Sequence, residues 1–392
     1  MHSAAVLSPA LRNSDRPAIP FFPYPQVFLR EQEDLVRIFC DVGRRGAFIL
    51  QHDLTRFEQN LAHFTGARHA VGVANATDGL IIALKAALEA PGRDPLRRDA
   101  EIIFCAHTMV ATAAAIHFAG CRPVPVECGA DHLIDPASVE AAITPRTVAL
   151  VPTQLNGRTA NMEALEQLAR RHHLIIVEDA AQALGSRFQG QCAGTFGSAG
   201  AISFFPAKLL GCLGDGGAVL SNDRQVAARC FALHDHGRDA AGEVTGWGLN
   251  SRLDNLQAAI LDFRLARYQA VIERRRALAR AYEHRLANVA AVILPPAPDA
   301  GDSHFDVYQN YEIEAERRDA LRAHLEASGV GTLLPWGGKA VHQFAALGLK
   351  AHLPRTESLM AKALLLPLHA WLTEEEVDRI ATAIRGFYGS RP

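Results

Sequence analysis

The segment 202–223, ISFFPAKLLGCLGDGGAVLSND, places a lysine between two apolar runs of strand character. The runs AGAISFF (199–205) and GAVLSND (217–223) predict two strands, and the residues between them are too few for a full helix. Lys208 lies in this connection, just before a loop with four glycines in seven residues. A buried ammonium loses hydration that apolar neighbours cannot replace. Lys208 is therefore either an ordinary surface side chain at a strand end or an amine with a chemical role.

The chain on the N-terminal side of this segment alternates short apolar runs with amphipathic helical stretches from about residue 69 onward. The predicted strands are HAVGVAN (69–75), EIIFCA (101–106), CRPVPVEC (121–128), TVALVPTQ (147–154) and LIIVEDA (174–180). The helical stretches between them are 77–90, 108–120, 135–143 and 161–173. This alternation is typical of a mostly parallel sheet covered by helices on both faces. We therefore predict an α/β fold in which ligands bind beyond the carboxyl ends of the strands.

The region after the glycine loop has a different composition. A long charged helical stretch is predicted from about 253 to 290, and a run rich in proline and turn residues follows at 294–304. A smaller α+β segment completes the chain. The predicted organisation is an N-terminal extension (1–24), a large α/β domain (25–255), and a long connecting helix with a small C-terminal α+β domain (256–392).

The composition excludes several classes of protein. Lys+Arg is 40 and Asp+Glu is 42, so no basic field is available for nucleic acid or a membrane surface. The seven cysteines are odd in number and never spaced C-x-x-C, which argues against a disulfide framework and against zinc. The first twenty residues lack the pattern of a signal peptide, and the apolar windows are too short to span a bilayer. We expect a cytoplasmic protein without a metal site.

Three residues near predicted strand ends or helix starts are candidates beside Lys208. Asp179 ends an apolar strand and is either a helix N-cap or a functional acid. Thr77 opens a helix directly after a strand, where it either caps the helix or binds phosphate together with the helix N-terminal amides. Ser203 lies five residues before Lys208. The glycine loop is not a nucleotide P-loop, because here the lysine precedes the glycines.

Together these residues match the requirements of pyridoxal 5'-phosphate (PLP). Its aldehyde forms a Schiff base with a lysine, for which Lys208 is the candidate, and its phosphate suits a helix start such as that at Thr77. An acid such as Asp179 keeps the pyridine nitrogen protonated, so that the ring withdraws electrons from the substrate. Partial desolvation lowers the pKa of a lysine, so the released amine can also carry protons.

Three segments of the chain resemble the DegT/StrS-type family of sugar aminotransferases, which are PLP-dependent enzymes of fold type I. The segments are VANATDGLIIAL (73–84), VEDAAQALGSRFQGQCAGTFGSAGAISFFPAKLLGCLGDGGAVLSND (177–223) and GWGLNSRLDNLQAAI (246–260). The likeness extends from about residue 25 to the C-terminus. It implies that Lys208 carries the Schiff base, that Asp179 faces the pyridine nitrogen and that Gln182 bonds the phenolic oxygen of the cofactor.

The resemblance also implies a phosphate site shared between two subunits. The backbone of Ala76 and the side chains of Thr77 and Ser203 are expected to bind the phosphate, and Asn250 is expected to reach it from the neighbouring subunit of a homodimer. Two residues depart from the family pattern: Ala76 precedes Thr77 where glycine is common, and Met109 stands where an aromatic ring usually stacks on the cofactor. Methionine is polarizable and can lie on a ring face in the same way.

We therefore expect an aminotransferase that moves an amino group from glutamate to a keto sugar, with pyridoxamine 5'-phosphate as the intermediate form of the cofactor. The expected acceptor is a nucleotide-linked keto-hexose used in amino-sugar biosynthesis. One alternative is a PLP- or PMP-dependent sugar dehydratase of the same family, although those enzymes typically carry histidine where this chain has Lys208. A second is a non-catalytic PLP-binding regulator. The sugar or cyclitol, the carbon aminated (C3 or C4) and the nucleotide remain open.

Overall fold

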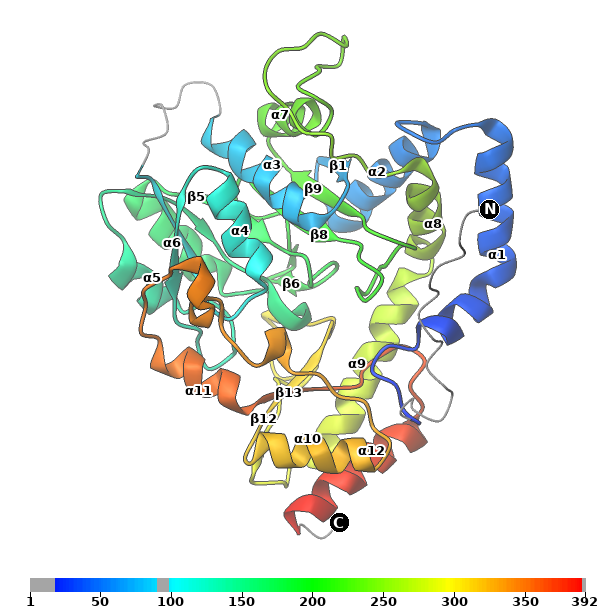
Figure 1. The fold of residues 1–392 in the computed structure, drawn as a ribbon, viewed down its shortest axis with the longest axis vertical. Coiled ribbons are helices and arrows are strands. Elements are labelled where there is room, and N and C mark those ends of the chain that lie inside the picture. The colour runs from blue at the N-terminus through cyan, green and yellow to red at the C-terminus, as the bar shows by residue number, and fades with distance from the viewer. Residues whose placement is uncertain (1–17, 90–98, 390–392) are drawn as a thin grey trace, which may run out of the picture.

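The computed structural model describes residues 18–89 and 99–389 and has a seven-stranded sheet at its centre (Figure 1). The strand order is β1-β9-β8-β5-β4-β2-β3. The strands are β1 (His69–Val73), β2 (Glu101–Cys105), β3 (Arg122–Val126), β4 (Thr147–Val151), β5 (Ile175–Asp179), β8 (Ala199–Ser203) and β9 (Gly217–Ser221). Each strand predicted before and around Lys208 is therefore confirmed. Of the predicted extension 1–24, only 18–24 lies within the described residues.

The sheet is mostly parallel, as predicted. Strands β3, β2, β4, β5 and β8 are parallel to one another, whereas β9 runs antiparallel to both β8 and β1. A parallel connection needs a crossover of a dozen or more residues, usually a helix. The connection between β8 and β9 contains no helix, and it returns the chain in the opposite direction. Lys208 lies in this connection.

Helices cover both faces of the sheet. On one face lie α3 (Ala76–Leu88), α4 (Val110–Phe118) and α7 (Arg224–His234), and on the other lie α2 (His52–Thr65), α5 (Pro136–Ala142), α6 (Met162–His172) and α8 (Asn255–Leu265). Side chains alternate along each strand, so Ile102 and Phe104 of β2 join the first layer while Ile103 joins the second. Because both faces of the sheet are buried, its strands appear in the sequence as continuous apolar runs.

The prediction of one long helix at 253–290 is wrong in one respect, because the chain forms two helices there. α8 ends at Leu265, and α9 (Tyr268–Leu286) begins after a break at Ala266 and Arg267. The hydroxyl of buried Tyr268 donates a hydrogen bond of 2.8 Å to the backbone oxygen of Leu184. This contact anchors the start of α9 to the large core, and the helix then leads away from it (Figure 1).

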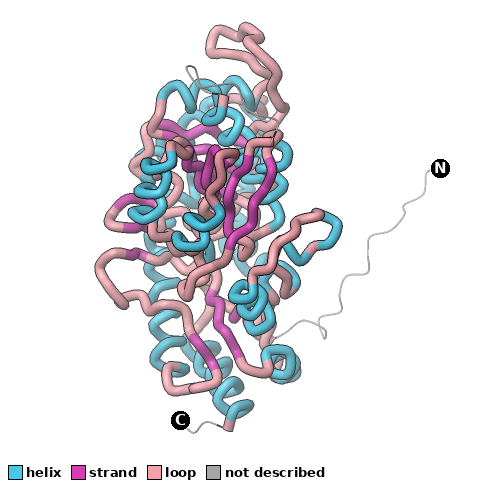
Figure 2. Tube along the Cα trace, turned by 90° about the vertical axis from the view of Figure 1, so that its left-hand side faces the viewer, coloured by secondary structure: helices cyan, strands magenta, loops and turns pink. Residues whose placement is uncertain are grey.

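A second core lies below the main sheet in Figure 1 and is built around the far half of α9. Its small sheet has the order β10-β12-β13, from β10 (Val292–Ile293), β12 (Tyr311–Ala315) and β13 (Ala363–Leu366). Helices α10 (Arg318–Ala327) and α12 (Glu374–Tyr388) pack on it, and α11 (Pro354–Lys362) precedes β13. In Figure 2 the strands of the main sheet and those of this sheet occupy separate levels of the molecule. A third sheet has the order β11-β6-β7 and consists of the two-residue strands β6 (Arg187–Phe188), β7 (Gln191–Cys192) and β11 (His304–Phe305).

Helix α1 (Tyr24–Arg45) lies against α8 at one side of the molecule (Figure 1). Only Leu35 and Val42 of this helix are buried, although it also carries Phe28, Leu29 and Phe39. A face of large apolar side chains is thus left uncovered within one chain. None of the helices in residues 18–89 and 99–389 is both long and apolar enough to cross a membrane.

Candidate active site

Lys208 lies in the turn after β8, where its backbone N–H donates to the Phe205 oxygen at 2.8 Å. Its side chain lines a cavity of about 570 Å³ that reaches from this turn to α1, α9 and the segment after β13. Burial lowers the pKa of Lys208 to about 8, and the nearby charge of Asp179 acts against this shift. At pH 7 roughly a tenth of such an amine is uncharged, against about one part in 2,500 at an ordinary lysine pKa. Lys208 is therefore suited to act as a nucleophile.

Asp179 is the last residue of β5 and is only 4% exposed. It is not a helix N-cap, because turns rather than a helix follow it. Its carboxylate accepts hydrogen bonds from the Thr112 hydroxyl (2.6 Å) and from the Ala181 N–H (3.2 Å). Burial raises the pKa of Asp179, whereas these two hydrogen bonds and the Lys208 charge act to lower it. The structure thus brings the predicted acid and the predicted lysine into one electrostatic environment.

The start of α3 is arranged to receive an anion. Asn75 is its N-cap and accepts a hydrogen bond from the Asp78 N–H at 2.9 Å, so Thr77 is not the capping residue. In the part of the chain that the structure describes, the Thr77 hydroxyl has no hydrogen-bond partner. The N–H groups of Ala76 and Thr77 are in the first turn, where an α-helix offers no internal acceptor. A helix start with free N–H groups and a free hydroxyl is a favourable phosphate site.

Strands β8 and β9 bring Ser203 toward this helix start. Ser203, at the end of β8, is paired with Gly217 at the start of β9. A Cβ on Gly217 would lie 2.6 Å from the carbonyl carbon of Asn75 and 2.8 Å from the nitrogen of Ala76. The glycine therefore permits the backbone of β9 to contact the first turn of α3 directly. This close approach gives one of the glycines of the 211–217 loop a structural role.

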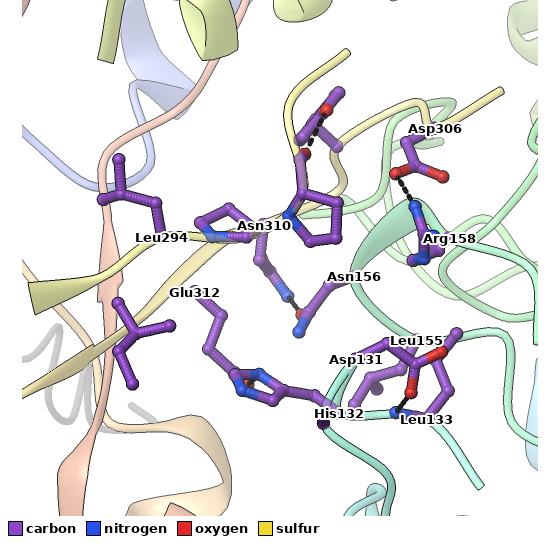
Figure 3. Close-up of a pocket in the computed structure, with 15 residues that line it drawn as sticks. Asp131, His132, Leu133, Leu155, Asn156, Arg158, Leu294, Asp306, Asn310 and Glu312 are labelled. Atoms are coloured by element: carbon purple, nitrogen blue, oxygen red, sulfur yellow. Dashed lines mark hydrogen bonds and ion pairs between the residues drawn. The ribbon is translucent and has the colours of Figure 1, made fainter. Parts of the chain in front are cut away.

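Gln182 is 8% exposed, and its orientation is set by two asparagines. Its Oε1 accepts hydrogen bonds from the Asn156 backbone N–H (3.0 Å) and from the Asn310 amide (3.4 Å). The same Asn310 amide donates to the Asn156 side-chain oxygen at 2.9 Å (Figure 3). Because its oxygen is occupied, the Gln182 amide directs its NH₂ elsewhere and can donate to a phenolic oxygen.

Sequence reasoning identified neither Asn156 nor Asn310. Asn156 has a left-handed backbone, with φ of 54°, a conformation that asparagine tolerates better than most residues. No local pattern indicated this turn, and Asn310 approaches Gln182 from 128 residues away. Thr112 was also missed, although it lies in the segment AHTMVAT that pointed to the cofactor ring.

A second cavity, of about 50 Å³, lies beside these asparagines between the two cores (Figure 3). On one wall His132 pairs with Glu312 (2.8 Å) and Glu314 (3.2 Å), and His107 lies 3.4 Å from Glu312. Burial acts to lower the pKa of His132, but its hydrogen bonds to the two glutamates outweigh this effect and raise the pKa to about 9. Burial acts to raise the pKa of Glu312, but the two histidines outweigh this effect and hold the pKa well below its usual range. This ionic cluster joins the large core to β12.

Met109 and Asn250 are placed near the site, but their roles stay predictions. Met109 is the N-cap residue of α4, three residues before Thr112, and its side chain is exposed. Asn250 is exposed as well. The adjacent Ser251 accepts a hydrogen bond of 3.2 Å from the Ala74 N–H, so this segment passes the loop that leads into α3.

These residues fit PLP by their chemistry. The Lys208 side chain is half-buried, and its amine has no hydrogen-bond or ion-pair partner among the described residues. It would hold the aldehyde carbon. Asp179 would pair with the pyridine nitrogen, Gln182 would donate to the phenolic oxygen, and the α3 start with Thr77 and Ser203 would bind the phosphate. The cavity at Lys208 is also lined by Asn310, which contacts Gln182, but Asp179, Thr77 and Ser203 do not line it.

Comparisons with known proteins identify the family of this chain. Residues 30–385 match the model of the DegT/DnrJ/EryC1/StrS aminotransferase family. The chain is 39% identical over 95% of its length to the dTDP-3-amino-3,4,6-trideoxy-alpha-D-glucose transaminase of Streptomyces venezuelae, 97% of which is covered. It is 37% identical over 94% of its length to a pleiotropic regulatory protein of Geobacillus stearothermophilus, 98% of which is covered.

The structural comparison gives the same result. The crystal structure of S. venezuelae DesV in complex with a ketimine intermediate superposes with a TM-score of 0.89 at 38% identity, covering 96% of this chain and 100% of that chain. The match extends over both cores and includes the segment that carries Lys208. The chain therefore belongs to the DegT/DnrJ/EryC1/StrS aminotransferase family, as a PLP-dependent sugar aminotransferase of fold type I.

Proposed function

We propose that this protein transfers an amino group from glutamate to a nucleotide-linked keto-hexose, as a cytoplasmic homodimer. The observation that carries the proposal is the unpaired Lys208 amine, which lines a cavity of about 570 Å³ and whose pKa burial lowers to about 8. A structural lysine would be paired or solvated instead. The substrate class is supported by the name of the S. venezuelae relative, a dTDP-3-amino-3,4,6-trideoxy-alpha-D-glucose transaminase.

Each residue has a separate task in this reaction. When bound, PLP supplies an electron-withdrawing ring that stabilises negative charge at the carbon losing a proton. Lys208 would hold the cofactor, and its free amine would carry a proton between the donor Cα and the C4' position. Asp179 keeps the pyridine nitrogen protonated, and Gln182 donates to the phenolic oxygen. The same residues perform these tasks in reverse when the keto sugar accepts the amino group.

A donor–acceptor screen tests this function. The purified protein is incubated with glutamate and with nucleotide-linked 3-keto and 4-keto hexoses, and 2-oxoglutarate and the aminated sugar are measured by mass spectrometry. We expect turnover with a 3-keto substrate and none in the Lys208→Ala control. If the wild-type protein binds PLP but converts no donor, the non-catalytic regulator becomes the better description. The name of the Geobacillus relative makes that control necessary.

The homodimer is supported by the apolar surface of a single chain. Leu29 of α1 is 67% exposed, Phe39 is 63% exposed, and Trp247 in the loop before Asn250 is 98% exposed. Large apolar side chains exposed on these two elements are typical of interaction surfaces. A two-fold dimer buries one such surface against its copy and brings the loop of one subunit to the other. We propose that Asn250 then completes the phosphate site of the partner subunit.

Subunit exchange tests the shared site. Inactive Lys208→Ala protein is mixed with an Asn250→Asp variant, whose added carboxylate repels the phosphate, and the subunits are allowed to exchange. Random reassortment makes about half of the dimers hybrid, each with one intact site, so about a quarter of wild-type activity returns. If Asn250 serves its own chain, every site keeps one lesion and no activity returns. Size-exclusion chromatography and differently tagged subunits verify that both variants are dimeric and that exchange has occurred.

A further inference from the structure

Three threonine hydroxyls form a continuous hydrogen-bonded chain that ends on Asp179. The Oγ1 of Thr153 lies 3.0 Å from that of Thr108, which lies 2.8 Å from that of Thr112. Thr112 in turn lies 2.6 Å from Oδ2 of Asp179. Thr108 and Thr112 are fully buried, and Thr153 is 4% exposed. Solvent therefore does not replace any of these contacts.

The direction of the chain follows from the acceptor at its end. An ionised carboxylate only accepts hydrogen bonds, so Thr112 donates its single hydroxyl hydrogen to Asp179. Thr112 must then accept from Thr108, and Thr108 must accept from Thr153. All three hydroxyl dipoles consequently point toward the carboxylate. Hydrogen bonds aligned in this way polarise one another and strengthen the last of the series.

The strand order of the sheet brings these residues together. Asp179 ends β5, Thr153 follows the adjacent β4, and Thr108 follows β2, the next strand. Thr112 lies in the first turn of α4, and its hydroxyl reaches Asp179 from 67 residues away in sequence. The positive end of the α4 dipole is near the same carboxylate and favours its charged form.

We propose that Thr112, supported by Thr108 and Thr153, is a positioning residue that fixes the Asp179 carboxylate and keeps it charged toward the cofactor pyridine nitrogen. Asp179 is buried, and burial alone favours its neutral form. A neutral Asp179 would leave the pyridine nitrogen unprotonated and the ring a weaker electron sink. This inference rests on the proposed function, because that function requires a charged Asp179 beside the pyridine nitrogen.

The test replaces Thr112 by valine, which has the same shape without the hydroxyl, and by serine, which restores the hydroxyl. Each protein is reconstituted with PLP labelled with ¹⁵N in the ring, and the ¹⁵N chemical shift is followed from pH 6 to 9. In Thr112→Val the signal is expected to move toward that of the unprotonated nitrogen, with kcat falling about 10- to 100-fold and the KM for glutamate changing less than threefold. Thr112→Ser is expected to retain the wild-type shift.

Two further variants provide graded and matched controls. Thr108→Val removes the second link of the chain and is expected to give a smaller change in the same direction. It also allows the test to proceed if Thr112→Val does not fold. Thr65→Val removes a buried hydroxyl that bonds the Leu61 oxygen in α2, and it is expected to leave the ¹⁵N shift unchanged.

Asp179→Asn separates a failure of this inference from a failure of the proposed function. If Asp179→Asn shifts the ¹⁵N signal while Thr112→Val and Thr108→Val do not, the threonine chain is overturned and Asp179 keeps its role. If Asp179→Asn also leaves the signal unchanged, the assignment of Asp179 to the pyridine nitrogen is wrong, and the inference fails with it. A loss of kcat in Thr112→Val without a ¹⁵N change would likewise overturn the positioning role.

Discussion

Replacing Gly217 with alanine should weaken cofactor binding while leaving the fold intact. The new Cβ would lie 2.6 Å from the carbonyl carbon of Asn75 and 2.8 Å from the nitrogen of Ala76. Ordinary contacts begin near 3.4 Å, so the first turn of α3 must move by about 0.8 Å. Overpacking of this kind costs about 1–3 kcal/mol. If this energy is lost from phosphate binding because the site is displaced, PLP affinity falls about 5- to 150-fold.

The assay for Gly217→Ala titrates PLP into the cofactor-free protein and follows absorbance, with the Tm of the cofactor-free form measured in parallel. Gly386→Ala is the matched control, because Gly386 is exposed in α12 and an added Cβ there contacts nothing within 4 Å. That control should keep wild-type affinity and gain slightly in stability. A folded Gly217→Ala protein whose PLP affinity is within twofold of wild type would refute the close contact between β9 and the phosphate site.

Three further predictions concern other parts of the molecule. Borohydride reduction of the PLP-bound protein should attach the cofactor at Lys208 alone, and a labelled peptide that contains Lys85 instead would contradict the assignment. Met109→Phe should retain PLP as well as wild type does, whereas Met109→Asp should retain it less because a charge then faces an apolar ring. Equal retention of PLP in all three proteins would show that another residue covers the ring. His132→Gln should lower the Tm, because it removes the ion pair with Glu312 that raises the pKa of His132 to about 9. The loss of Tm should be largest below pH 6.5, where this pair contributes fully to stability, and it should shrink as the pH rises through 9. A Tm difference that is constant from pH 6 to 10 would contradict that ionic role.

Local patterns in the sequence determined the layers of the fold. Both faces of the central strands are buried, so each strand appears in the sequence as a continuous apolar run, and the helices between them carry a 3.6-residue period. Lys208 and Asp179 were predicted because each interrupts or ends such a run. The short strand β13 and the break between α8 and α9 were not predicted, since neither has a distinctive local pattern. Strand β13 packs in the second core, and the break lies between Leu265 and Tyr268, which pack in the large core.

Only the tertiary structure decided how the candidate residues are supported. Thr112 reaches Asp179, and Asn310 reaches Gln182, because the strand order and the approach of the second core place them there. Periodicity indicates which residues form a strand, but it carries no information about which strands become neighbours. Buried hydroxyl and amide groups must find partners wherever the packed chain offers them. Their partners are therefore set by topology, which emerges only when the whole core is assembled.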